Sequence, residues 1–303
     1  MNETKEEVFF IWNIDKSIII GKNQLLEGEV NLDYAKKINA LIYRRPSGGG
    51  AIYADNGCFM FSFVSRSINK DEVYKKYLSL IVEALKKVGI DAYFSGRNDL
   101  MFNNKKFSGN AFYSNKNGSV LHGTFLYNTN LEDLVKSITP DNEKLISKGI
   151  KSVRERVINI GDYTAFSKQE MMEYLINFIS LEKIFLSEIN LKKVKQIEEK
   201  YLSSEWIYGN NPRFTYKNSK RYDYGKIEVF IDVFKNKIKS MSLKGDFLEI
   251  NPVDEFCEKF IEVEFNKSEF IKVIEKIDIS NYILNSKNNE FINIIFEEEN
   301  LGN

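Results

Sequence analysis

The chain has 303 residues, of which 43% are hydrophobic and 28% are charged, an ordinary composition for a soluble globular protein. Lys+Arg and Asp+Glu each number 43, so no basic excess indicates binding to nucleic acid or to an anionic membrane. The only cysteines are Cys58 and Cys257, without CxxC spacing. This pattern argues against a zinc site and favours a reducing, cytoplasmic environment. The apolar stretches near the N-terminus are too interrupted for a signal peptide or membrane span.

The first half of the chain is expected to alternate short strands with a few helices. Residues 71–88 give the clearest helix, because apolar side chains recur on one face and Gly89 follows. A second, shorter helix is expected at 34–39. Strands are expected at 8–12, 17–21, 58–64, 92–94, 99–102, 107–113 and 120–127, with a hairpin turn at 114–118.

The second half begins with a more helical region and continues into a smaller unit. Helices are expected at 131–137, 168–179, 191–201, 252–260 and 267–274. Strands are expected at 225–234 and 237–243, after a turn-laden segment at 206–214 and a polar stretch at 217–224. Short connections between strands favour mostly antiparallel sheets, so the fold class is α+β. We place a large domain at 1–216 and a small α+β domain at 220–303.

A glycine-rich stretch, Arg44-Arg45-Pro46-Ser47-Gly48-Gly49-Gly50-Ala51-Ile52-Tyr53, lies between two strand-like runs. Glycine brings bare backbone close to a ligand, and successive N–H groups in such a turn can hold an anion. The arginine fork suits phosphate or carboxylate. The alternative interpretation is a flexible surface turn.

A second stretch of the sequence favours the binding loop over the flexible surface turn. Gly96-Arg97-Asn98-Asp99-Leu100 leads into Lys105-Lys106-Phe107-Ser108-Gly109-Asn110. Mg²⁺ prefers carboxylates and substrate phosphates as ligands, and lysine supplies a mobile positive charge for a leaving group or an acyl phosphate. Together, in this order, the two stretches indicate a nucleotide-activating site.

These stretches, with His122-Gly-Thr-Phe-Leu and the Ser-Lys-Gly-Ile-Lys-Ser-Val-Arg-Glu-Arg-Val motif at 147–157, resemble the lipoate–protein ligases. The likeness runs from about residue 8 to the C-terminus. It implies a biotin/lipoate ligase-like fold: a large catalytic domain of mixed, mostly antiparallel sheets flanked by helices, and a small α+β accessory domain. In that family the accessory domain is expected to rotate between the two steps of the reaction.

The resemblance implies a reaction in two steps. The carboxylate of lipoate attacks the α-phosphate of ATP, with Mg²⁺, to form lipoyl-AMP and pyrophosphate. A lysine of an acceptor domain then takes the lipoyl group. The expected acceptors are E2 subunits of 2-oxoacid dehydrogenases or the glycine-cleavage H protein. A monomeric, cytoplasmic enzyme is expected, without nucleic acid or membrane partners.

The resemblance also implies roles for individual residues. Lys106 matches the catalytic lysine, which contacts both the nucleotide phosphate and the lipoyl carbonyl. The remaining expected contacts are to ATP from Arg45, Gly50, Ala51, Ile52 and Tyr53, to lipoate from Ser47, Gly48, Gly49, Ser108 and Gly109, and to Mg²⁺ from Asn98 and Asp99. For Asp99, Ser47 and Ser108, stabilising a local turn is the open alternative.

The sequence departs from the family pattern at three positions and has a short N-terminus, with only residues 1–7 ahead of the first strand. Ala54 stands where a histidine is usual, Cys58 where an asparagine is usual, and Leu121 where a second histidine commonly precedes His122. His122 is the only histidine. We favour a structural strand residue over a general base for His122, and a buried strand residue over a nucleophile for Cys58.

Two other functions remain open. One is an octanoyl or lipoyl transferase that works through a cysteine thioester, for which Cys58 is the candidate. The other is a catalytically impaired module that binds lipoyl domains. The intact Gly96-Arg97-Asn98-Asp99 stretch looks like that of a ligase, and the presence of Lys106 argues against the binding module.

Overall fold

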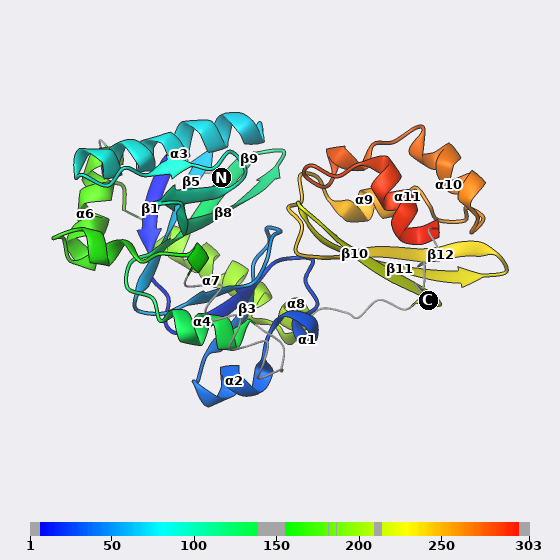
Figure 1. Cartoon of the computed structure of the whole chain (residues 1–303), viewed down its shortest axis with the longest axis horizontal. Coiled ribbons are helices and arrows are strands. Elements are labelled where there is room, and N and C mark those ends of the chain that lie inside the picture. Colours follow the sequence, from blue (N-terminus) through cyan, green and yellow to red (C-terminus); the bar gives the residue numbers. More distant parts are fainter. Residues whose placement is uncertain (1–6, 139–154, 181, 186, 209–213, 297–303) are drawn as a thin grey trace. The chain divides into compact units, whose positions relative to one another are not determined.

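The structure is a computed structural model that describes residues 7–138, 155–180, 182–185, 187–208 and 214–296. Contacts divide the chain into two compact units (Figure 1). The first unit takes in the chain up to Ile20, then Leu26–Arg45 and Ala51–Tyr208. The second unit combines the C-terminal part of the chain with two short segments of the N-terminal half, Gly21–Leu25 and Pro46–Gly50.

The first unit is built on a six-stranded antiparallel sheet in the order β1-β5-β9-β8-β7-β6. Its strands are β1 (Val8–Trp12), β5 (Cys58–Ser65), β6 (Tyr93–Phe94), β7 (Asp99–Phe102), β8 (Lys105–Asn115) and β9 (Gly118–Leu126). Each expected strand is present, and β8 and β9 extend further into their hairpin than the apolar pattern indicated, because the residues at their tips, such as Ser114, Asn115 and Ser119, are polar.

Helix α3 (Lys70–Lys87) covers one face of this sheet together with α6 (Lys168–Ile179) (Figure 1). The side chain of Asn69 accepts hydrogen bonds from Asp71 N and Glu72 N and so caps the start of α3. Gly89 ends the helix with a φ of 84°. Between the helices and the sheet lies the main core of the unit, rich in stacked aromatic rings such as the pair Phe63 and Tyr77. The helix expected at residues 71–88 is confirmed as α3.

A smaller sheet in the first unit carries the start and end of the glycine-rich stretch. Its central strand is β2 (Ser17–Ile20), which pairs in parallel with β3 (Leu41–Arg44) and antiparallel with β4 (Ile52–Ala54). The small helices around it are α1 (Leu26–Glu29), α2 (Leu32–Lys37) and α4 (Leu131–Ser137). Ile18, Ile20 and Tyr53 bury their side chains in the core that these elements enclose.

The last elements of the first unit are η1 (Ile160–Tyr163), α7 (Glu188–Leu202) and α8 (Ser204–Tyr208). The expectation of a turn at 206–208 is wrong, because these residues are helical. Trp206 Nε1 donates to Arg44 O at 2.8 Å, and Arg44 Nε donates to Ile207 O at 2.9 Å. These bonds fix α8 against the end of β3. Residues 209–213 of that segment, and residues 147–154 of the motif at 147–157, lie outside the described residues.

The second unit packs three helices on a three-stranded antiparallel sheet, β10-β11-β12 (Figure 1). Its elements are β10 (Tyr216–Tyr222), β11 (Gly225–Phe234), β12 (Lys237–Gly245), α9 (Val253–Glu258), α10 (Lys267–Ile274), η2 (Ile279–Asn281) and α11 (Asn288–Phe296). The polar stretch at 217–224 proves to be strand β10 and its turn. This edge strand exposes most of its side chains, so it lacks an apolar pattern.

The α+β class with mixed, mostly antiparallel sheets is confirmed, and β2–β3 is the parallel pair among the described strands. Across the described part of the chain, none of the helices combines the length and the apolar character that crossing a membrane requires.

Candidate active site

Lys106 lies on β8 beside the first residue of β7. Its Nζ is 2.8 Å from Asp99 Oδ1, a close ion pair whose atoms are not aligned as a hydrogen bond. The Lys106 side chain is 38% exposed and can be reached by a ligand, whereas the Asp99 side chain is 29% exposed but its Oδ1 is buried. The sequence predicted that these two residues act at one site, and the structure brings them together.

A bulge in the β7–β8 ladder shapes this corner. Leu100 pairs with Ser108 but Met101 pairs with Lys106, which leaves Phe107 as an extra residue on β8. Phe107 is fully buried and its ring packs edge-on against Phe125. Bulges re-aim side chains and often adjoin functional sites. Here the buried ring anchors the strand next to Lys106.

Gly109 is the residue that leaves room for the Lys106 side chain. A Cβ at this position would lie 2.7 Å from Lys106 Nζ and 2.8 Å from Lys106 Cε. Gly109 N also donates to Thr124 Oγ1 at 3.2 Å, which fixes the backbone there. Glycine is therefore favoured at position 109 for a steric reason, in addition to its expected contact with lipoate.

The turn that carries Asn98 and Asp99 is locked by Asn110. Asn110 N and Nδ2 both donate to Asn98 O, at 2.9 and 2.8 Å, and Asn98 Nδ2 donates back to Asn110 O at 3.1 Å. Tyr74 Oη of α3 donates to the same Asn110 carbonyl at 3.4 Å. Asn110 ends the Lys-Phe-Ser-Gly-Asn motif, but nothing in the sequence indicates that it locks this turn.

Arg45 and His122 are close enough to interact through charge. Arg45 Nη1 donates to Ile19 O at 3.0 Å, and burial lowers the pKa of Arg45 to about 10, so the guanidinium stays charged at neutral pH. Burial and, secondarily, the charge of Arg45 lower the pKa of His122 to about 3. A neutral imidazole with so low a pKa is a weak base, which favours the structural interpretation of His122.

The strand after the glycine loop, β4, is an edge strand that, among the described strands, pairs with β2 alone. Ile52 and Tyr53 belong to it, and Ala51 directly precedes it. Tyr53 as a whole residue is 1% exposed, whereas Ala51 and Ile52 are partly exposed, so a ligand would reach this segment at Ala51 and Ile52. An edge strand has one side without a neighbouring strand, which suits the expected contact with the adenine edge.

The glycine loop itself, Pro46–Gly50, groups with the second unit. Gly49 has a φ of 91°, and its N–H donates to Phe247 O at 2.8 Å. Gly48 is so close to the following chain that a Cβ would lie 2.8 Å from Phe247 O and 2.9 Å from Glu249 N. Ser47, which is 2% exposed, accepts a backbone bond from Lys22 N at 2.9 Å. Within this unit the loop therefore contacts residues 247–249.

Ser108 was expected to contact lipoate or to stabilise its own turn. The residue is fully buried, and its Oγ donates to Asn110 Oδ1 at 3.4 Å. This favours the turn-stabilising alternative.

Asp99 and Asn98 supply one carboxylate and one amide oxygen for a cation. Among the described residues, no group of three or more His, Cys, Asp or Glu side chains could hold a metal ion. Mg²⁺ commonly takes one or two protein carboxylates and completes its shell with water and substrate phosphates. The residues therefore fit a magnesium ion shared with a nucleotide, not a metal held by the protein alone.

Cys58 lies in a small apolar cluster with Ala54, Met60 and Leu126. Its thiol donates to Asp55 O at 3.4 Å, and burial raises the pKa of Cys58 to about 11. Since the thiolate is the nucleophile, this residue is inert at neutral pH.

Comparison with known proteins identifies the family. The profile of the lipoyl protein ligase A/B catalytic domain matches residues 1–180, and that of the bacterial lipoate protein ligase C-terminus matches residues 211–295. The chain is similar to the lipoate-protein ligase LplJ of Bacillus subtilis, with 31% identity over 96% of this chain and 92% of that protein.

Solved structures of lipoate–protein ligases are also similar to this chain. The Plasmodium falciparum LipL1 structure in complex with lipoate gives a TM-score of 0.79 at 28% identity, covering 97% of this chain and 86% of that one. A bipartite lipoate protein ligase from Thermoplasma acidophilum, described with its E2 lipoyl domain, gives 0.64 at 29% identity, over 70% and 88% of the chains. A lipoate-protein ligase A bound with ATP gives 0.60 at 27% identity, over 68% and 87%.

The fold and the profile matches define a lipoate–protein ligase. The chain belongs to the lipoate–protein ligase family and is a ligase.

Proposed function

We propose that this chain activates lipoate with ATP to form lipoyl-AMP, releases pyrophosphate, and transfers the lipoyl group to a lysine of a lipoyl acceptor domain. The corner formed by Lys106, Asp99 and Gly109 carries the proposal, because a lysine whose Nζ is held at 2.8 Å from a carboxylate is exposed enough to meet a ligand. The similar structures with lipoate and with ATP support the substrates.

Lys106 would act by electrostatics. When the lipoate carboxylate attacks the α-phosphate, negative charge develops on the phosphoryl oxygens, and a fixed ammonium stabilises it. In the second step the same ammonium would stabilise the oxygen of the acyl carbonyl while the acceptor amine attacks. Asp99 holds the ammonium in place before the nucleotide arrives.

Other residues would hold the nucleotide and the acid. Arg45 would contact phosphate, and the backbone from Gly50 through Ala51 and Ile52 to Tyr53 would contact adenine. Ser47, Gly48, Gly49 and Gly109 remain the proposed contacts to lipoate, whereas the fully buried Ser108 would support them from within its strand. Asp99 and Asn98 would hold Mg²⁺ together with the phosphates, and the bound cation would neutralise charge on the leaving pyrophosphate.

Proposed domain roles follow the profile matches. Residues 1–216 would form the catalytic domain and residues 220–303 the accessory domain, in line with profiles that match 1–180 and 211–295. We propose that the enzyme is a cytoplasmic monomer.

The proposed acceptors are E2 subunits of 2-oxoacid dehydrogenases and the glycine-cleavage H protein. The E2 lipoyl domain described with the Thermoplasma acidophilum ligase supports the first of these. The test is to incubate the protein with ATP, Mg²⁺, lipoate and a purified apo-lipoyl domain, and to measure the acceptor by mass spectrometry. One lipoyl group on the acceptor lysine is expected. An unmodified acceptor with folded enzyme, for both kinds of acceptor, would contradict the proposal.

The thioester alternative is tested at Cys58. The buried thiol with its raised pKa predicts that Cys58→Ala keeps ligase activity within about twofold, with only the modest loss of stability typical of a small cavity. The control is Cys257→Ala, the other buried free cysteine. Loss of acyl transfer in Cys58→Ala alone, in a folded protein, would favour the transferase instead.

A further inference from the structure

The hydrogen bonds between β4 and β2 are too few to fix the position of β4 by themselves. This strand has three residues, Ile52, Tyr53 and Ala54, and pairs on one side only, with β2. Few ladder bonds hold so short an edge strand. Other contacts must therefore keep its backbone in place.

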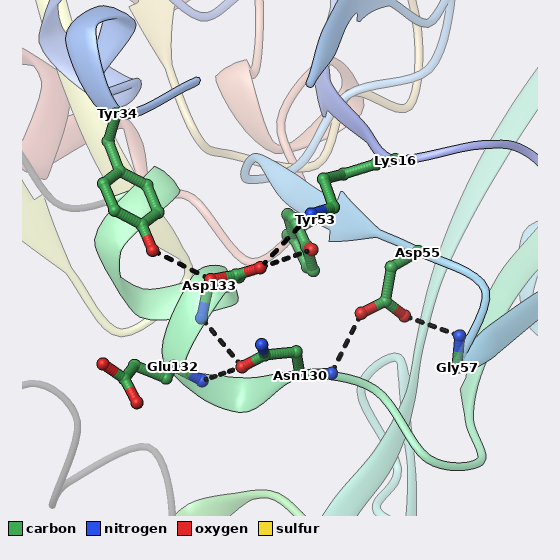
Figure 2. A network of polar contacts seen from close by, with 8 residues as sticks. All are labelled: Lys16, Tyr34, Tyr53, Asp55, Gly57, Asn130, Glu132 and Asp133. Atoms are coloured by element: carbon green, nitrogen blue, oxygen red, sulfur yellow. Dashed lines mark hydrogen bonds and ion pairs between the residues drawn. The ribbon is translucent and has the colours of Figure 1, made fainter. Parts of the chain in front are cut away.

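One such contact runs through Asp133 of α4 (Figure 2). Asp133 Oδ2 accepts a hydrogen bond from Tyr53 Oη at 3.3 Å, and Asp133 Oδ1 accepts one from Tyr34 Oη of α2 at 2.8 Å. Lys16 Nζ, just before β2, lies 3.6 Å from Asp133 Oδ2. The Asp133 side chain is 15% exposed, so this largely buried carboxylate joins α4 to β4, to α2 and to the residue before β2.

A second contact holds the other end of β4 to the start of the same helix (Figure 2). Asp55 Oδ2 accepts from Asn130 N at 3.0 Å, and Asp55 Oδ1 accepts from Gly57 N at 2.8 Å. A Cβ at Gly57 would lie 2.0 Å from Asn128 O, so this turn packs directly on the chain that leads into α4. Asn130 in turn caps α4 by accepting from Asp133 N at 3.1 Å.

We propose that Asp133 is a positioning residue for ATP, which holds β4 through the Tyr53 hydroxyl so that the backbone of Ile52 meets the adenine edge. Asp133 itself touches no substrate. The inference rests on the proposed function, because the contact between β4 and adenine belongs to that proposal. Burial and the nearby carboxylates raise the pKa of Tyr53, and burial followed by Asp133 raises that of Tyr34 to about 12. Both hydroxyls therefore remain hydrogen-bond donors throughout an assay at neutral pH.

The two tyrosines supply a matched pair of variants. Tyr53→Phe and Tyr34→Phe each remove one hydroxyl that donates to Asp133, but only Tyr53 lies on the strand proposed to contact ATP. We expect Tyr53→Phe to raise the KM for ATP about fivefold, the effect of one hydrogen bond, with kcat and the KM for lipoate within about twofold. Tyr34→Phe should leave the KM for ATP within about twofold. Asp133→Ala should reproduce Tyr53→Phe, and Asp133→Asn, which keeps one acceptor oxygen, should recover part of the loss.

An equal effect of Tyr53→Phe and Tyr34→Phe on the KM for ATP, or no effect of either, would overturn the inference and leave Asp133 a structural residue. Hydrogen exchange in the wild-type protein separates this result from a failure of the proposed function. If ATP binds along β4, it slows exchange at amides of residues 50–54 in the wild type. If ATP binding leaves those amides unchanged, the proposed placement of ATP is wrong, whatever the variants do.

Discussion

Lys106 meets two requirements of a catalytic cation. It must be accessible to a ligand, and it must be held still before the ligand arrives. The ion pair with Asp99 and the absence of a Cβ at Gly109 meet both demands. An exposed ion pair of this kind contributes little to stability. We infer that its value lies in positioning the charge.

The first prediction concerns this lysine. Lys106→Ala should lower the rate of lipoyl-AMP formation at least about 100-fold, because one preorganised electrostatic contact to the transition state is lost. The product is measured directly by chromatography of the quenched reaction, and circular dichroism checks the fold. Lys105→Ala is the matched control, since it removes the adjacent lysine of β8 and should keep near-normal activity. Wild-type rates in folded Lys106→Ala would refute the assignment of this site.

A second prediction concerns His122 and pH. The folded protein lowers the pKa of His122 to about 3, whereas the ordinary value near 6.5 applies in the unfolded chain. Between these values the unfolded chain binds more protons, so the stability linked to His122 is complete above pH 6.5 and is lost as pH falls below it.

Urea unfolding at pH 7 and pH 5 measures this effect. Wild type should lose about 1–2 kcal/mol more of its unfolding free energy between these pH values than His122→Gln does, because the variant has no imidazole to protonate. His122 is the only histidine, so no other imidazole contributes. Equal losses in both proteins would mean that His122 titrates normally in the folded state.

The glycine loop shows why three successive glycines are not equivalent. Gly49 adopts a positive φ, Gly48 lies against backbone atoms of residues 247 and 249, and a Cβ at Gly50 would meet only the Asp246 Cβ, at 3.9 Å. The N–H of Gly49, expected to help bind lipoate, donates here to Phe247 O. A ligand that takes this donor must replace that carbonyl.

A pair of alanine variants tests this packing. Gly48→Ala should lower the unfolding free energy by about 1–3 kcal/mol, because its Cβ would press against two backbone atoms that cannot move aside alone. Gly50→Ala, at an exposed position where the added Cβ makes only an ordinary van der Waals contact, should cost much less. Thermal unfolding of the two variants compares them. If Gly50→Ala proves the more destabilising, the contact between the loop and residues 247–249 is not as described.

The sequence predicted the elements that have a strong hydrophobic periodicity or a specific motif. It did not predict the elements that have neither. Helix α3 was predicted because seven apolar residues recur on one face, and Lys106 with Asp99 because their motifs are specific. Strand β10 and helix α11 were not assigned: the strand is polar on an exposed edge, and the helix has a short apolar run without clear caps. The link between Tyr53 and Asp133 spans 80 positions, and only the folded chain brings these side chains together.

In the whole molecule, the two compact units are not continuous in sequence, because the second unit includes two short segments of the N-terminal half. Arg45, Ala51 and Lys106 belong to the first unit, whereas Ser47 to Gly50 group with the C-terminal part. Within the second unit, Glu249 joins the segment Gly21–Leu25 to the start of α9. Its carboxylate contacts Lys22 Nζ at 3.0 Å and accepts from Val253 N, at the start of α9, at 2.9 Å. Contiguous apolar patterns could not reveal such a division.

The central claim is that this protein forms lipoyl-AMP before any acceptor is present. The most direct measurement is pyrophosphate release from ATP and Mg²⁺ by the full-length protein, with and without lipoate and with no acceptor protein added. We predict release that depends on lipoate and that is lost in Lys106→Ala. Folded protein that releases no pyrophosphate with lipoate would contradict the claim and favour a thioester transferase or a non-catalytic lipoyl-domain binder.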